Sequence, residues 1–265
     1  LVMTRDGVLV ARHENEISGT TDVADRPDFA DRRTERLIDG VKAAGWFTED
    51  FTLAELKTLR ARERLPDLRP ASAAFDGADA ESRRTGRTIG TYPEMKHPTY
   101  FEARGLPMGT SLAAALRDNG LDQRDAPVFV QCFEPKPLRA FRGISAAPTV
   151  MLVGAGRLSD SLLAEVAEFA DGLGPELRMV LDVAATGLPA TGLIARAQAA
   201  GMKVHPWTVR SENSFLPAAL RQGEDPAGHG DAASLLRAVF GAGADGVFTD
   251  FPELAVKVRQ EMFGA

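Results

Sequence analysis

The chain has almost no cysteine and no long apolar run. Cys132 is its only cysteine, so the sequence holds neither an internal disulfide nor a zinc site built from several thiolates. No apolar stretch approaches the roughly 18 residues that a membrane-spanning helix requires. The sequence therefore predicts a protein with no membrane span and one buried thiol.

Excess positive charge is also missing. The 265 residues include 31 Lys and Arg against 37 Asp and Glu, which gives a formal net charge of -6. This balance argues against a general nucleic-acid binder and against a protein that adsorbs to anionic membranes. Any phosphate must then be bound by a few local groups and not by a broad basic face.

No Gly-x-Gly-x-x-Gly pattern follows a predicted strand, which weakens the dinucleotide-binding alternative. From residue 89 onward, strands instead alternate with helices. The predicted strands are 89–95, 128–132, 149–153, 172–174, 203–209 and 246–249, and the predicted helices are 111–119, 159–170, 191–200, 232–241 and 252–263. Short, continuously apolar strands between helices indicate a parallel sheet buried on both faces. The length and the repeat number favour a closed (β/α)8 barrel over an open sheet.

The first fourteen residues have the pattern of a β-hairpin. Two apolar runs flank Asp6-Gly7, a pair typical of a two-residue turn with positive φ. A crossover helix does not fit between the runs, so the two strands must be antiparallel. With this loop, Met3 faces Val10, and His13 faces the position before Leu1. The hairpin is thus predicted to deliver a single histidine to one place.

Residues 14–88 are predicted to form one long insertion after a barrel strand. Residues 14–45 are polar and densely charged, which predicts a solvated loop. Thr52 and Glu55 form a capping box that opens a short helix ending at Leu59. Residues 61–88 show no convincing strand.

Polar side chains stand where predicted strands end, and barrel enzymes carry their chemistry at those ends. Alternation along 91–98 puts Glu94 and Lys96 on one face. One interpretation is an internal ion pair. The other is that Glu94 ligates a hard divalent cation while Lys96 neutralises a substrate phosphate. Prolines on both sides rigidify this segment and favour the second interpretation.

Three further strand ends carry candidate residues. Gln131 either hydrogen-bonds a polyol or a carboxylate, or packs at the rim of the core. Trp207 is a candidate floor for a small-molecule pocket, whereas His205 is interpreted as a structural histidine. Asp250 either caps the last helix or supports a neighbouring active-site group. His229, in a glycine-bearing loop, is predicted to be exposed.

Eight motifs follow one another over nearly the whole chain. They are TRDGVLVARH (4–13), GTTDV (19–23), FTLAEL (51–56), YPEMK (92–96), VQCF (130–133), ADGLGP (170–175), VHPWTVR (204–210) and DGVFTDFP (245–252). In this order they resemble the glycerophosphodiester phosphodiesterases, in particular the larger bacterial periplasmic or secreted type. The resemblance implies an α/β fold, a TIM (β/α)8 barrel of the phospholipase C-like phosphodiesterase type. It forms a single domain over 1–265, with the 14–88 insertion after the strand ending at His13.

The resemblance also implies a function. Family members hydrolyse glycerophosphodiesters to glycerol 3-phosphate and an alcohol, with a divalent cation that is calcium or alternatively magnesium. By this resemblance His13 is the second of two histidines that act as acid and base, Glu94 is a metal ligand and Lys96 contacts the phosphate. Trp207 and Phe248 match positions near the substrate pocket. A small-molecule substrate, no nucleic acid, a role in glycerol and lipid metabolism and a periplasmic or secreted location complete this expectation.

Part of the family pattern is not in the chain. The first histidine, in a His-Arg-Gly motif, and a metal-binding Glu-x-Asp pair are expected before Leu1, on N-terminal strands that the chain does not contain. The chain is also shorter than the family at 77/78 and 155/156. Two alternatives stay open. One is a related barrel phosphodiesterase acting on lysolipids, which needs a wide apolar groove, and the other is an inactive or binding-only relative.

Overall fold

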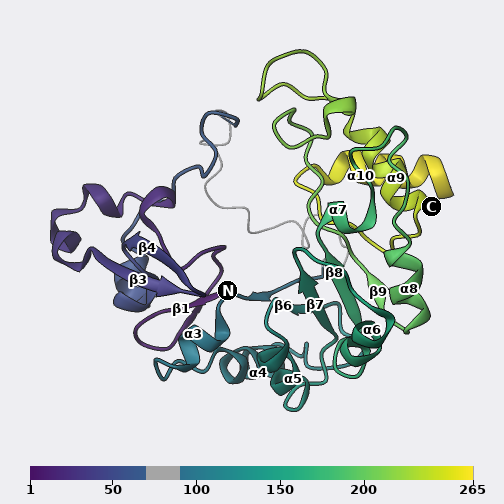
Figure 1. Ribbon diagram of the computed structural model, residues 1–265. Helices are drawn as coiled ribbons and strands as arrows, with labels where there is room; N and C mark the ends of the chain where they lie inside the picture. The colour runs from purple at the N-terminus through teal and green to yellow at the C-terminus, as the bar shows by residue number, and fades with distance from the viewer. Residues whose placement is uncertain (70–89, 265) are drawn as a thin grey trace. The chain divides into compact units, whose positions relative to one another are not determined.

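The computed structural model describes residues 1–69 and 90–264 (Figure 1). The chain divides into two compact units, Leu1–Pro148 and Thr149–Ala265. The expectation of a single domain over 1–265 stays a prediction. Within the described residues, none of the helices is both long and apolar enough to cross a membrane.

The first unit contains two antiparallel hairpins, one parallel strand pair and several short helices. Its strands are β1 (Val2–Met3), β2 (Leu9–Val10), β3 (Thr34–Ile38), β4 (Val41–Gly45), β5 (Glu94–Met95) and β6 (Val130–Cys132). Its α-helices are α1 (Leu53–Leu56), α3 (Pro98–Glu102), α4 (Met108–Asp118) and α5 (Pro135–Arg142). Its 3₁₀ helices are η1 (Ser18–Thr20), η2 (Val23–Asp25), η3 (Pro27–Arg32) and η4 (Thr48–Asp50).

The β1–β2 hairpin forms as predicted, but the predicted register is wrong by one residue. Met3 pairs with Leu9. The amide of Thr4 donates to the carbonyl of Val8 (2.9 Å), so the loop has three residues and not two. Gly7 ends this loop at a φ of +77° and donates to Thr4. A three-residue loop closed by a left-handed glycine is the next most common hairpin connection after the two-residue turns, and the extra residue shifts every cross-strand partner by one.

The prediction of a solvated loop over 14–45 is also wrong. This stretch contains the β3–β4 hairpin, which turns at Asp39-Gly40, where φ is +49° and +82°. Two positive φ values are the signature of a type I′ turn. The insertion also has an apolar core of its own, made of Ile17, Val23, Phe29, Trp46 and Phe51. Arg32 lies over the ring of Phe29, so charged side chains cover this core. The high density of charge in the sequence therefore does not mean that the stretch is a solvated loop.

The capping box at the start of α1 is confirmed. Thr52 Oγ1 accepts from the amide of Glu55 (3.2 Å), and a Glu55 carboxylate oxygen accepts from the amide of Thr52 (2.8 Å). The helix ends at Leu56 and not at Leu59 as predicted. Leu59 instead packs against the insertion core.

Strand β5 has neighbours on both sides within the first unit. It runs parallel to β6, with Glu94 opposite Gln131. On its other side, the Leu1 nitrogen donates to the Glu94 carbonyl (2.5 Å), and the Leu1 carbonyl accepts from Lys96 (3.2 Å). These two bonds have the slanted pattern of a parallel ladder. Figure 1 shows α4 and α5 side by side below β6.

The second unit alternates strands and helices as predicted. Its strands are β7 (Thr149–Val153), β8 (Gly172–Pro175) and β9 (Lys203–Val204), all parallel. Its helices are α6 (Asp160–Ala167), α7 (Leu177–Val180), α8 (Leu193–Ala199), η6 (Ala218–Leu220), α9 (Ala232–Gly241) and α10 (Pro252–Phe263). Helices α9 and α10 lie side by side (Figure 1) and have the predicted bounds. The predicted strand 246–249 is reduced to a single parallel bridge between Val209 and Thr249.

The structure describes one of the two junctions at which the chain is expected to be shorter than the family. Junction 155/156 lies in the loop between β7 and α6, where Gly156 adopts a φ of +94° that favours glycine. Junction 77/78 lies outside the described residues.

Candidate active site

Glu94 and Lys96 lie together at the carboxyl end of β5, as the strand alternation predicts. Both side chains are largely buried, and Oε1 of Glu94 lies 3.2 Å from Nζ of Lys96. Met95, between them, points the other way into the core. The ammonium of Lys96 also faces the ring of Phe133, 5.8 Å from its centroid. The pair is therefore fixed in place by the strand and by its neighbours.

Two buried oxygens on β5 and β6 accept no hydrogen bond. Oε1 of Glu94 has the lysine beside it but no donor in hydrogen-bonding geometry, and Oε1 of Gln131 has none either. Glu94 and Gln131 are register partners, so their side chains point to the same face of the sheet. Carboxylate and amide oxygens that accept no hydrogen bond are suitable ligands for a hard divalent cation.

The described residues supply only part of a metal-binding set. Over 1–69 and 90–264, no three His, Cys, Asp or Glu side chains lie close enough together to hold a metal ion. Cys132, beside Gln131, is fully buried, and burial raises the pKa of its thiol to about 12. Burial thus favours the neutral thiol, which is a poor ligand and a poor nucleophile.

His13 follows β2 and contacts the next residue in the chain. Its Nδ1 lies 2.6 Å from Oε1 of Glu14. The other oxygen of Glu14 lies 3.6 Å from Nε2 of His97. The hydrogen bond from His13, and then the contact with His97, hold the pKa of Glu14 well below its usual range. Glu14 is therefore a carboxylate held between two imidazole rings.

His97 has a second carboxylate on its other ring nitrogen. Its Nδ1 lies 2.5 Å from Oδ2 of Asp39, which stands in the type I′ turn of the β3–β4 hairpin. Contact with Glu14 raises the pKa of His97 against the opposing effect of burial, and Asp39 adds to the increase. The sequence reading missed Glu14, Asp39 and His97. The Asp39-Gly40 pair is typical of a two-residue hairpin turn, so the sequence could have placed Asp39 at the tip of a hairpin.

A buried carboxylate anchors the segment that follows His13. The Asn15 side chain donates to both carboxylate oxygens of Glu49, at 3.2 and 3.3 Å. The hydroxyl of Tyr100 donates to the same carboxylate, and Arg36 lies 3.7 Å away. Since Asn15 and Glu49 are both buried, this network fixes the backbone next to His13 and Glu14.

In the second unit, Trp207 is fixed against β8. Its indole Nε1 donates to the Gly174 carbonyl (2.8 Å), and its backbone bridges to Glu176. His205 lies where a Cβ at Gly246 would be 3.1 Å from its ring, and burial lowers its pKa. This environment agrees with the structural role predicted for His205.

The remaining candidates of the second unit also have defined positions. Phe248 is half-buried, and His229 is exposed as predicted. Asp250 accepts from Nε of Arg210 (2.7 Å). It does not cap the last helix, since the cap residue of α10 is Phe251 and no side chain bonds there. The capping interpretation of Asp250 is therefore wrong.

The structure thus brings the predicted residues of the first unit into two linked groups. Glu94, Lys96 and Gln131 lie at the ends of β5 and β6, and His13 pairs with Glu14. His97, which directly follows Lys96, connects the two groups. Trp207 and Phe248 belong to the second unit.

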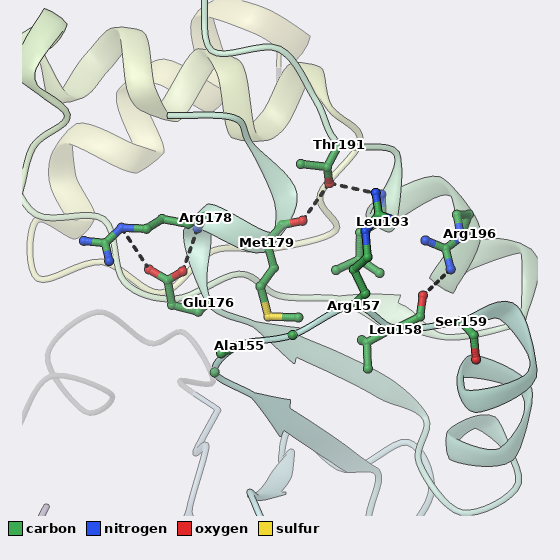
Figure 2. A pocket seen from close by; sticks show the side chains of 12 residues that line it. Ala155, Arg157, Leu158, Ser159, Glu176, Arg178, Met179, Thr191, Leu193 and Arg196 are labelled. Carbon is green, nitrogen blue, oxygen red and sulfur yellow. Dashed lines mark hydrogen bonds and ion pairs between the residues drawn. The ribbon is translucent and has the colours of Figure 1, made fainter. Parts of the chain in front are cut away.

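A cavity of about 870 Å³ opens at the carboxyl ends of β7 and β8 (Figure 2). Its lining combines Leu158, Met179 and Leu193 with the charged residues Arg157, Glu176, Arg178 and Arg196. Arg196 donates to Asp160 (2.6 Å) and also to the carbonyl of Leu158. Arg178 lies 3.9 Å from Glu176. The cavity therefore has a mixed lining, with apolar side chains and three guanidinium groups around it.

Comparison with known proteins identifies the family. A family model described as "Glycerophosphoryl diester phosphodiesterase family" matches residues 1–254. The chain belongs to this family. It is 31% identical to glycerophosphodiester phosphodiesterase GDPD6 of Arabidopsis thaliana, over 95% of this chain and 74% of that protein. It is 24% identical to the glycerophosphodiester phosphodiesterase of Haemophilus influenzae, over 97% and 79%.

Solved structures of the glycerophosphodiester phosphodiesterase family share the fold. A phosphodiesterase of Oleispira antarctica, in complex with the product sn-glycerol-3-phosphate, superposes with a TM-score of 0.60 at 17% identity, covering 97% of this chain and 81% of that one. The family enzyme of Thermotoga maritima gives a TM-score of 0.50 at 13% identity, covering 97% and 81%. The α/β fold of the TIM-barrel phosphodiesterases and the class, phosphoric diester hydrolase, are thus confirmed.

Proposed function

We propose that the protein hydrolyses a glycerophosphodiester to sn-glycerol 3-phosphate and an alcohol by histidine acid–base catalysis that depends on a divalent cation. The observation that carries this proposal is the pairing of Glu94 and Lys96, with its buried unbonded oxygen, at the carboxyl end of a parallel strand. Barrel enzymes carry their catalytic groups at these ends. Family membership supports the reaction class.

Each candidate site residue of the first unit has a proposed role in this reaction. The ammonium of Lys96 binds a phosphoryl oxygen as a point charge. Nε2 of His13 moves a proton, to or from an oxygen of the diester or its nucleophile, and such a step contributes about 10²- to 10⁴-fold in rate. Glu94, with Gln131 beside it, would hold the cation as an oxygen ligand. When bound, calcium or magnesium supplies Lewis-acid stabilisation of the phosphoryl charge, worth several kcal/mol.

The cavity of the second unit favours a small polar diester over a lysolipid. A lysolipid needs a wide apolar groove for its acyl chain. The cavity at the ends of β7 and β8 instead carries Arg157, Arg178 and Arg196. These guanidinium groups can pair with a phosphate, whereas an acyl chain offers them no partner. A periplasmic or secreted location, carried by the resemblance, completes the proposal.

The test is an assay of glycerol 3-phosphate release from glycerophosphocholine in the presence of calcium. We expect turnover by the protein and a loss of about 10²- to 10⁴-fold in kcat for His13→Ala. His229→Ala is the matched control, because His229 is exposed in a loop of the other unit. Equal activity in His13→Ala and His229→Ala would contradict the role of His13.

Three other outcomes would each reject part of the proposal. A folded protein that releases no glycerol 3-phosphate from any diester supports the binding-only alternative. Lysophosphatidylcholine turned over as fast as glycerophosphocholine supports the lysolipid alternative. Activity that persists after chelation with EDTA contradicts the metal role of Glu94.

A further inference from the structure

A chain of alternating charged side chains runs from the tip of the β3–β4 hairpin to His13. Asp39 contacts His97 at 2.5 Å, and His97 lies 3.6 Å from Glu14. Glu14 contacts Nδ1 of His13 at 2.6 Å. Three segments that are far apart in the sequence, at 13–14, 39 and 97, supply this path.

The contacts determine where the protons lie. Nδ1 of His97 is 2.5 Å from the carboxylate of Asp39, and its Nε2 faces the carboxylate of Glu14 at 3.6 Å, an ion-pair distance beyond a hydrogen bond. Two carboxylates beside the ring favour the imidazolium form. The raised pKa of His97 agrees with this state. Glu14 is ionised, so Nδ1 of His13 must be the donor in their contact. In the tautomer with the proton on Nδ1, the lone pair of the His13 ring lies on Nε2, where it can accept a proton.

The Glu14 contact alone is too weak to hold the ring of His13. About half of each side chain is exposed, at 58% for His13 and 41% for Glu14. An isolated exposed ion pair contributes about 0–1 kcal/mol, which leaves the ring free to rotate. His97 is only 20% exposed, and its Nε2 lies 3.6 Å from the second oxygen of Glu14. A contact on one oxygen and a nearby positive charge on the other therefore limit the orientations open to the carboxylate.

The backbone adopts unusual conformations to build this chain. Asp39 and His97 are non-glycine residues with φ of +49° and +50°. Asp39 takes this conformation in the hairpin turn, and His97 takes it just before α3. Left-handed conformations are uncommon for such residues, and they cluster at functional sites when the surroundings over-determine them.

We propose that Asp39, His97 and Glu14 are positioning residues that hold His13 as its Nδ1–H tautomer with Nε2 available for reaction. The β3–β4 hairpin of the insertion is then part of the catalytic apparatus. This inference rests on the proposed function, in which His13 transfers the proton. A purely structural tie between the hairpin and α3 is the competing explanation.

Nitrogen-15 NMR of the imidazole side chains separates the two explanations without an assay. The chain has only four histidines, so each ring can be assigned. We expect His13 as the Nδ1–H tautomer and His97 protonated at both nitrogens near neutral pH. In His97→Asn, His13 should become a mixture of tautomers. Asparagine tolerates the left-handed conformation but brings no charge and fewer donor directions. An unchanged His13 spectrum in His97→Asn overturns the proposal.

Kinetics provide the second readout. Removing a residue that orients a functional histidine typically lowers activity by about 10- to 100-fold. We therefore expect kcat of His97→Asn to fall by that factor and KM to change by less than about twofold. Asp39→Asn should change kcat in the same direction and less. Asp25→Asn is the matched control, since Asp25 is an exposed residue of the same insertion that pairs with Arg62.

The outcomes separate this inference from the proposed function. A rise in KM with kcat unchanged, or an equal loss in Asp25→Asn, contradicts the positioning role. No turnover by the unmodified protein rejects the proposed function. In that case the NMR arm still decides the tautomer and its dependence on His97.

Discussion

Glu94 has a buried carboxylate oxygen that accepts no hydrogen bond, although it lies 3.2 Å from the ammonium of Lys96. A buried polar atom without a hydrogen bond costs the folded state about 1–3 kcal/mol. Glu94 is also the register partner of Gln131, so the two side chains point to the same face of the sheet. The ion pair and the proposed ligand role share this arrangement, and cation binding by the folded protein separates them.

The sequence could predict this pair but not the network around His13. Alternation along a strand is local, so it placed Glu94 and Lys96 on one face. The contacts of Glu14 with His97 and of His97 with Asp39 join positions 14, 39 and 97. Such contacts depend on how the insertion packs, and no spacing rule in one sequence reports that packing.

Glu49→Gln tests the buried carboxylate that anchors the segment after His13. An amide in place of the carboxylate turns one acceptor into a donor that faces the donors of Asn15 and Tyr100. We expect the free energy of unfolding to fall by about 1–3 kcal/mol. Urea denaturation with an unchanged m-value is the measurement.

Glu35→Gln is the control for this substitution, because Glu35 lies exposed on β3. It should change the free energy of unfolding by less than about 0.5 kcal/mol. Equal effects of the two substitutions would show that the network around Glu49 adds nothing to stability.

At the scale of elements, an Asp-Gly pair predicted the first hairpin correctly, whereas a second Asp-Gly pair was not interpreted as a hairpin turn. Asp-Gly stands at 6–7 and at 39–40, and both pairs turn a hairpin. The second was missed because β3 and β4 show no apolar alternation. Leu37 and Val41, beside the turn, are 61% and 68% exposed, whereas Ile38, directly before the turn, is buried. Periodicity reports burial of every second residue against a core, and apolar residues that lie exposed on both strands remove that signal.

The exact loop of the first hairpin could not be read from Asp-Gly alone. Both two-residue and three-residue loops place a glycine at positive φ. Thr4 decides between them, because its hydroxyl accepts from the amide of Val8 at 2.9 Å and closes the longer loop. The predicted α/β alternation of the second unit was more accurate because it rests on whole strands and helices.

The capping box of α1 predicts a dependence of stability on pH. Contact with Arg32, and then the amide of Thr52, lowers the pKa of Glu55 to about 2. In the unfolded chain this carboxyl takes up its proton near its ordinary pKa of about 4.3. Between these two values the unfolded state binds more protons, so stability is present above the higher pH and is lost as the pH falls toward 2.

Glu55→Gln should therefore reduce this loss. We expect its free energy of unfolding to fall less steeply between pH 4.3 and about 2 than that of the unmodified protein. Denaturant titrations across this range measure the slope. Glu35→Gln, at an exposed carboxylate of the same insertion, is the control. Parallel curves for the unmodified protein and Glu55→Gln would contradict the assigned contact.

At the scale of the whole molecule, composition and order of motifs predicted more than any single element did. A net charge of -6 and a single cysteine excluded broad classes, and the ordered motifs indicated the family that the comparisons confirmed. Composition does not report how a chain divides. The two compact units and the separate apolar core of the insertion arise from packing, where Phe29 and Phe51 meet edge to face at 5.1 Å.

Cation binding by the proposed site should be visible in the stability of the whole protein. A ligand that binds only the folded state stabilises it by about 2.7 kcal/mol at a concentration 100-fold above its dissociation constant. For a chain of this size that corresponds to a rise in Tm of about 5–10 °C. Calorimetry over a calcium series, repeated with magnesium, measures the rise and its dependence on concentration.

Glu94→Gln decides whether Glu94 is responsible for that rise. The variant keeps the shape of the side chain but loses its charge, so the rise in Tm should shrink or require a much higher calcium concentration. Glu102→Gln, on α3 and exposed, should keep the full rise. An equal rise in Glu94→Gln and the unmodified protein would place the cation elsewhere, because a ligand carboxylate cannot be replaced by an amide without loss of affinity for a hard cation.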